Sequence, residues 1–181
     1  MSRGKRKRPM RSAMPTLAFV VDGETEVWYL QMLKRNERHI RFSIKPEIPN
    51  RKSVEDQYKL VCSLAEKEYE RVFWIIDLDT VIKEEKERPK GKESPLKTLE
   101  KHRTKLKHKY KNVEIIINNP CLEFWFLLHF KKTTKYFHPC SSVEPELRRH
   151  LKSFEKTRKY FMKQNDDIYL KLKPYLKTAI V

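Results

Sequence analysis

Two short apolar runs that stop abruptly at acidic residues constrain the fold of this chain more than any other feature. Residues 17–21 read LAFVV and are followed by Asp22, and residues 73–76 read FWII and are followed by Asp77. A continuous apolar run of this length with a polar end is typical of a strand buried on both faces of a parallel sheet. We therefore predict an α/β fold with both strands inside the sheet.

Acidic residues gather where these two predicted strands end. In open α/β sheets, ligands bind beyond the carboxyl ends of the strands, so neighbouring strand ends bring their side chains to one place. Carboxylates within about 4–6 Å repel and raise one another's pKa, whereas a hard divalent cation takes oxygen ligands and relieves the repulsion. We predict that Mg²⁺, or Mn²⁺, is held there by four acids: Asp22, Glu26, Asp77 and Asp79.

The remaining periodicity predicts that strands and helices alternate along the chain. A half-buried strand is predicted over 40–48, a helix capped by Ser53 follows it, and a further strand covers 113–117. This order favours a mainly parallel four-stranded sheet flanked by helices. Residues 80–94 are highly charged and contain proline and glycine, so we predict a basic loop with at most one helical turn beside the metal.

The helix that begins at Pro120 is nearly apolar all round, and we expect it to be buried against the sheet. Glu123 is the exception, because a carboxylate in the first turn of a buried helix needs a partner. Helix N–H groups, a basic side chain and the metal cluster are the three candidates. In the last case Glu123 joins the catalytic residues.

Composition divides the chain into three parts. Residues 1–14 hold six basic residues and no acid, which predicts a disordered basic arm. Residues 15–130 carry the predicted acids and form the predicted catalytic domain. Residues 131–181 are basic and less periodic, and we predict a helical C-terminal extension.

A polyanionic partner is predicted from the charge. The chain has 41 Lys and Arg against 24 Asp and Glu, a formal net charge of +17, and the excess is concentrated away from the predicted acids. Such a distribution favours nucleic acid, whose phosphates release counterions when neutralised, although a well-solvated surface is the plain alternative. The residues predicted to bind nucleic acid are Arg51, Lys52, Lys83, Lys131 and Lys132.

The three cysteines, Cys62, Cys121 and Cys140, lack a metal-type spacing. Their odd number favours a reducing cytoplasm, and we predict that each is a small buried hydrophobe or an idle thiol. No stretch approaches the roughly 18 apolar residues of a membrane helix, so no membrane association is expected. The sequence leaves homo-oligomerisation open.

Three stretches together resemble a known family. Residues 22–26 (DGETE) and 77–79 (DLD) resemble the metal-binding Toprim domain of topoisomerases, primases and OLD-type nucleases. With residues 119–130 (NPCLEFWFLLHF) they are similar to the RloB-like family, a bacterial Toprim-type group associated with phage defence and abortive infection and typically encoded beside an ATPase partner. The resemblance implies a Toprim-like Rossmannoid fold. It departs from the family at Asp22, where glutamate is usual.

The sequence is compatible with three functions. The first is a Mg²⁺-dependent nuclease for DNA or RNA, in which Asp77 and Asp79 hold the metal with Asp22 or Glu26, and the remaining carboxylate activates water. The second is a module that binds nucleic acid or an ATPase partner without chemistry. The third is a haloacid-dehalogenase-type phosphatase with Asp77 as nucleophile, for which the later Asp166-Asp167 pair does not follow an apolar strand.

Overall fold

A parallel β-sheet organises the computed structural model, which describes residues 16–39, 43–47, 53–67 and 69–180. The strands lie in the order β2-β1-β3-β4, and each neighbouring pair is parallel. Their bounds are Thr16–Val20 for β1, Ser43–Glu47 for β2, Arg71–Asp77 for β3 and Val113–Asn118 for β4. The predicted mixed α/β architecture with parallel strands is therefore confirmed.

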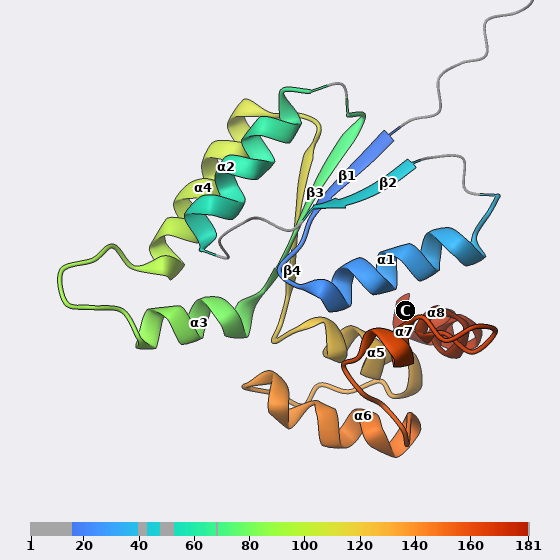
Figure 1. Cartoon of the computed structure of the whole chain (residues 1–181). Coiled ribbons are helices and arrows are strands. Elements are labelled where there is room, and N and C mark those ends of the chain that lie inside the picture. The colour runs from blue at the N-terminus through green and yellow to red at the C-terminus, as the bar shows by residue number, and fades with distance from the viewer. Residues whose placement is uncertain (1–15, 40–42, 48–52, 68, 181) are drawn as a thin grey trace, which may run out of the picture.

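Helices cover the sheet on both sides (Figure 1). α2 and α4 lie together on one face and α1 lies on the other, while α3 leaves the carboxyl end of β3. The helix α2 begins as predicted, because the Ser53 side chain accepts a hydrogen bond from the Asp56 amide. The bounds are Glu24–Asn36 for α1, Val54–Ala65 for α2, Leu78–Lys86 for α3 and Pro95–Lys109 for α4.

The two faces of the central strands are buried to different degrees. Val72, Trp74 and Ile76 of β3 point toward α2 and α4 and are almost fully buried. Phe73 and Ile75 on the opposite face are half-buried. The strand was predicted to be buried on both faces, but only the face toward α2 and α4 is fully buried. On the α1 side, Ile75 and the exposed Ile116 of β4 line an apolar cleft.

The segment after β3 is more helical than predicted. Residues 80–94 were expected to form a loop, but α3 continues through Lys86, and only the residues from Glu87 to Ser94 connect it to α4. The sequence of α3 explains the difference, because it contains neither proline nor glycine, and Val81 supplies a buried contact. The breakers Pro89 and Gly91 lie beyond its end.

The nearly apolar helix α5, Leu122–Phe130, is buried as predicted but against a different partner. Phe126 and Leu127 pack with Met32 of α1 and with the C-terminal extension, not with the sheet. α5 contacts α6 and α9 in particular. The extension comprises η1 Cys140–Ser142, α6 Glu144–His150, α7 Arg158–Phe161, α8 Ile168–Leu172, η2 Lys173–Tyr175 and α9 Leu176–Ile180.

Buried polar contacts attach the extension to α1. Asp167 is fully buried, and its carboxylate accepts hydrogen bonds from Arg35 at 2.6 Å and Asn36 at 3.0 Å. A second contact joins Glu37, just after α1, to the Tyr169 hydroxyl at 2.6 Å. These contacts fix the extension to the helix that begins beside Asp22.

The predicted arm over 1–14, together with Arg51 and Lys52, lies outside the described residues. Among the residues that are described, no helix combines the length and apolar character needed to cross a membrane.

We expect Asp167→Ala to lower the free energy of unfolding by roughly 2 kcal/mol, because it removes the N-cap of α8 and the buried acceptor of the Arg35 and Asn36 side chains. Asp166→Ala is the matched control. Its half-exposed pairs with Lys163 and Lys171 should contribute less than about 1 kcal/mol. Urea denaturation of both variants checks this, and equal losses would show that the buried contact has no special role.

Candidate functional site

Carboxylates meet at the carboxyl ends of the parallel strands. Asp22 follows β1, Asp77 is the last residue of β3, and Glu26 lies in the first turn of α1. The register of β3 and β4 places Asp77 beside Asn118, whose amide donates to Asp77 Oδ1 at 2.9 Å. These polar side chains lie together because the apolar runs of β1, β3 and β4 all end at the same edge of the parallel sheet.

A buried amide holds Asp22. The carboxylate is 9% exposed, and its Oδ1 accepts a hydrogen bond from Gln57 Nε2 at 3.0 Å. Gln57 in turn accepts one from the Trp74 indole at 2.7 Å. Both donors come from the well-packed α2 and β3 layer, so the side chain of Asp22 is fixed from the core outward.

Glu26 is enclosed by its own turn and by an apolar cleft. Its Oε2 accepts a hydrogen bond from the Thr25 hydroxyl at 3.0 Å, and a Cβ at Gly23 would lie 3.2 Å from the same oxygen. The cleft, about 310 Å³, is lined also by Tyr29 and Trp125. Burial raises the pKa of Glu26, and repulsion from neighbouring carboxylates adds to this rise.

Burial and neighbouring charges both act on Asp77. Burial raises its pKa to about 8, and the negative charges of Glu26, Glu123 and Asp22 contribute, while the hydrogen bond from Asn118 opposes the rise. Four acidic side chains are therefore within electrostatic reach of one another. The arrangement can hold a hard cation or keep a proton near neutral pH.

Of the three partners considered for Glu123, the structure shows a basic side chain. It is 2% exposed, and its Oε1 lies 3.0 Å from Lys156 Nζ. The same ammonium group pairs with Glu144 at 3.0 Å. Glu123 thus belongs to the acid cluster electrostatically and to an ion pair with the extension structurally.

Asp79 points to a different place from the other predicted ligands. Its Oδ2 accepts a hydrogen bond from the Cys140 amide at 3.0 Å. Within the described ranges, the one group of three potential His, Cys, Asp or Glu ligand atoms that lie within 4.8 Å of one another is Asp79, Cys121 and Cys140. Among the described residues, no three of the predicted ligands Asp22, Glu26, Asp77 and Asp79 have ligand atoms within that distance of one another. The structure therefore brings Asp22, Glu26 and Asp77 within electrostatic reach but does not group them, or Asp79 with them, at metal-ligand spacing.

The prediction of three isolated cysteines is corrected. Cys121 and Cys140 form a disulfide that joins the start of α5 to η1, and Cys62 is free. Sequence spacing could not reveal this pair, because the two cysteines are 19 positions apart and the whole of α5 lies between them.

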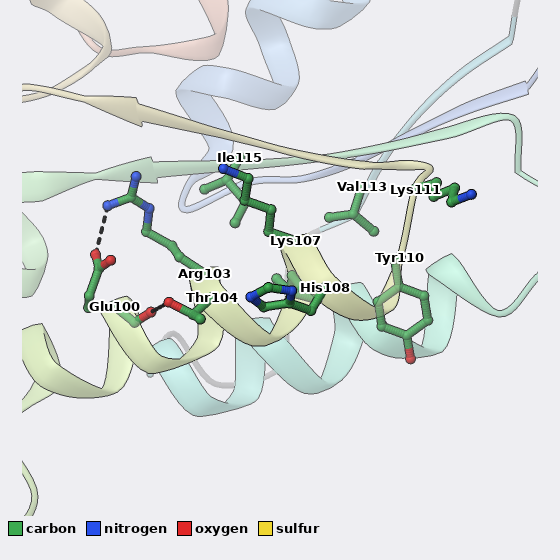
Figure 2. A pocket seen from close by; sticks show the side chains of 10 residues that line it. Glu100, Arg103, Thr104, Lys107, His108, Tyr110, Lys111, Val113 and Ile115 are labelled. Carbon is green, nitrogen blue, oxygen red and sulfur yellow. Dashed lines mark hydrogen bonds and ion pairs between the residues drawn. The ribbon is translucent and has the colours of Figure 1, made fainter.

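A basic groove of about 660 Å³ runs between α4 and β4 (Figure 2). Arg103 and Lys107 point from α4 toward β4, and Arg103 pairs with Glu100 at 2.8 Å. His108 and Lys111 line the same groove. Its wall includes the edge strand, so an elongated ligand could lie along it.

Residues predicted to contact nucleic acid are dispersed. Lys83 lines a separate groove that also includes Asp79 and His138. Lys131 lies 3.7 Å from Glu146, and Lys132 is exposed.

Sequence reasoning missed several residues that shape the site. Gln57 was detectable, because it occupies an apolar position of α2. Asn118 was detectable as the polar end of a strand. Lys156 gave no local signal, because its partner Glu123 lies 33 positions earlier in the chain.

One comparison with known proteins identifies a relationship. A family model described as RloB-like protein matches residues 17–181. Comparisons with curated proteins and with solved structures found no match.

Asp77 should make stability depend on pH. Its pKa of about 8 in the folded chain exceeds the ordinary value of 3.8, so folding favours the protonated acid. This contribution is complete below about pH 4 and is lost as pH rises through 8. We expect the metal-free protein to lose stability between pH 5 and 9, and Asp77→Asn to melt several degrees higher at pH 9, since 1 kcal/mol shifts Tm by about 2–4 °C at this size.

Thermal melts across this pH range test the expectation. Glu24→Gln, a change at an exposed carboxylate in the first turn of α1, is the control and should follow the wild type. A wild-type slope retained in Asp77→Asn would contradict the assignment.

Proposed function

The chain belongs to the RloB-like protein family, and on that premise we propose that it is a Mg²⁺-dependent nuclease with a Toprim-like site that hydrolyses DNA or RNA. The observation that carries the proposal is that Asp22, Glu26, Asp77 and Glu123 lie within electrostatic reach of one another at the carboxyl ends of β1 and β3. Like charges in a poorly hydrated place repel, a bound cation relieves the repulsion, and perturbed pKa values cluster at functional sites.

The donor set fits a hard divalent cation. Carboxylate oxygens are the ligands that Mg²⁺ prefers, and Asp22 and Asp77 offer them from adjacent strands. We assign these two residues to the metal, each already oriented by an amide donor, Gln57 or Asn118. When bound, Mg²⁺ would polarise the phosphoryl oxygen and stabilise the leaving oxyanion.

Glu26 is assigned the proton transfer. A general base works best with a pKa near the operating pH, and burial moves the pKa of Glu26 in that direction. The Thr25 hydroxyl fixes one carboxylate oxygen, and the apolar cleft limits bulk water on one side. Glu26 would therefore orient the attacking water and accept its proton.

The basic groove between α4 and β4 is assigned to the nucleic-acid backbone. Arg103, Lys107, His108 and Lys111 present cationic or hydrogen-bonding groups along one side of the edge strand. Contacts of this kind position a backbone without reading its sequence. The proposal leaves DNA and RNA as equal substrates.

A role in bacterial phage defence, under the control of an ATPase partner, rests on the family alone. The binding-only alternative is favoured by one observation, the engagement of Asp79 with the Cys140 amide instead of the acid cluster. The phosphatase alternative has no such support, because Asp167 pairs with Arg35 and caps α8.

Cleavage of labelled plasmid DNA and total bacterial RNA tests the nuclease. We expect turnover with Mg²⁺ or Mn²⁺ and none with EDTA. Glu26→Gln should slow cleavage by about 10²–10⁴-fold, the usual contribution of a general base, and Asp77→Asn should abolish it. Glu24→Gln should cleave like the wild type. Metal-independent cleavage, or equal rates in Glu26→Gln and Glu24→Gln, would reject the assigned site.

Binding measured by fluorescence anisotropy tests the groove without turnover, using Asp77→Asn as the background. Lys107→Glu with Lys111→Glu should weaken binding and reduce the salt slope by about 2 for duplex DNA, because each lost phosphate contact removes roughly 0.9. Lys152→Glu with Lys159→Glu, at exposed positions of the extension, makes the same change in net charge. Equal effects of the two pairs would show that net charge, not the groove, governs binding.

A further inference from the structure

Three ligand atoms of a second kind converge beside the acid cluster. Asp79 comes from the first turn of α3, Cys121 from the N-cap of α5 and Cys140 from the first position of η1. A carboxylate oxygen and the two sulfurs lie within 4.8 Å of one another. Both cysteines are buried, and three separate segments of the chain are needed to build the group.

Two nearby features oppose the negative charge of Asp79 and Glu123 on this group once the disulfide is reduced. Cys121 caps α5, a nine-residue helix whose N-terminus carries partial positive charge. Lys156 Nζ lies 3.9 Å from the Cys140 sulfur. Both features stabilise thiolates, which are the form of cysteine that binds metal.

We propose that Cys121, Cys140 and Asp79 bind Zn²⁺ when the cysteines are reduced. A dithiol reductant supplies two electrons and two protons, which convert the disulfide into two thiols as the dithiol itself becomes a disulfide. Zinc binding then releases the two thiol protons. The oxidised pair and the zinc-bound pair are mutually exclusive states of the same two sulfurs.

Reduction lets the three groups reach zinc geometry. Tetrahedral Zn²⁺ binds sulfur at about 2.3 Å and carboxylate oxygen at about 2.0–2.2 Å, so its ligands lie roughly 3.5–3.8 Å apart. The two sulfurs are bonded to each other in the oxidised chain and have to move apart to this separation, while the Asp79 oxygen already lies within 4.8 Å of both. Glu123 Oε2, 3.0 Å from the Cys140 sulfur, is a further oxygen donor at the same place. In the oxidised chain the Cys140 sulfur carries no proton, so Glu123 Oε2 accepts no hydrogen bond from it.

The two metal sites differ in chemistry. Asp22, Glu26 and Asp77 offer only oxygen and suit Mg²⁺, whereas two thiolates select a softer ion such as Zn²⁺. Zinc binding therefore goes beyond the proposed nuclease and does not depend on it. It also gives Asp79 a ligand role beside the acid cluster, with Glu123 at the boundary between the two sites.

Cobalt titration of the full chain tests the site. The protein is reduced with a dithiol, freed of reductant without air and titrated with Co²⁺, which reports thiolate ligation through a sulfur-to-metal charge-transfer band. We expect one equivalent to bind with this band and Zn²⁺ to displace it. Cys121→Ser and Cys140→Ser should lose the band, Asp79→Asn should bind more weakly, and Cys62→Ser, the matched control, should behave as the wild type.

Oxidised wild-type protein provides a comparison that needs no substitution, and it should show no band. Circular dichroism of each variant separates loss of ligand from loss of fold. Absence of the band in reduced wild type, its persistence in the oxidised protein or in Cys121→Ser, or its loss in Cys62→Ser would each overturn the proposal. Nuclease activity is not a readout, so failure here leaves the proposed function untouched.

Discussion

Crowding of carboxylates in a poorly hydrated place is the constraint on which the rest of this structure depends. Asp22, Glu26, Asp77 and Glu123 lie within electrostatic reach of one another, and the pKa of Asp77 is raised first by burial and then by the charges of the other three. Each carboxylate has a different partner. Three accept a hydrogen bond, Asp22 from Gln57, Asp77 from Asn118 and Glu26 from Thr25, and Glu123 forms an ion pair with Lys156. Charged groups that lower the stability of a fold are expected at functional sites.

These partner residues come from different layers of the structure. The C-terminal extension therefore contributes to a site built at the edge of the sheet. The sheet and α2 supply the two amides, whereas Lys156 comes from the extension. The extension in turn is fixed to α1 by Asp167 and shares an apolar cluster with α1 and α5. The helices that carry Glu26 and Glu123 are thus held together from the side opposite the sheet.

Local signals predicted the parts of the molecule that depend on local physics. The apolar runs before Asp22 and Asp77 identified parallel strands, and their acidic ends identified where side chains would meet. Long-range packing decided the rest. The apolar pattern of α5 could say that it is buried but not against what, and the direction of Asp79 depends on Cys140, 61 positions later. The family resemblance compensated in part, because it joined motifs that no periodicity connects, and family membership was confirmed.

The position of Lys156 in the chain also bears on synthesis. All the acids of the cluster have been translated by residue 123, but the ammonium group that pairs with Glu123 comes 33 residues later, and Asp167 later still. Thr25, Gln57 and Asn118, which bind the other three acids, all precede residue 123. During synthesis, the pairing of Glu123 is therefore the one contact of the four that waits for the C-terminal extension.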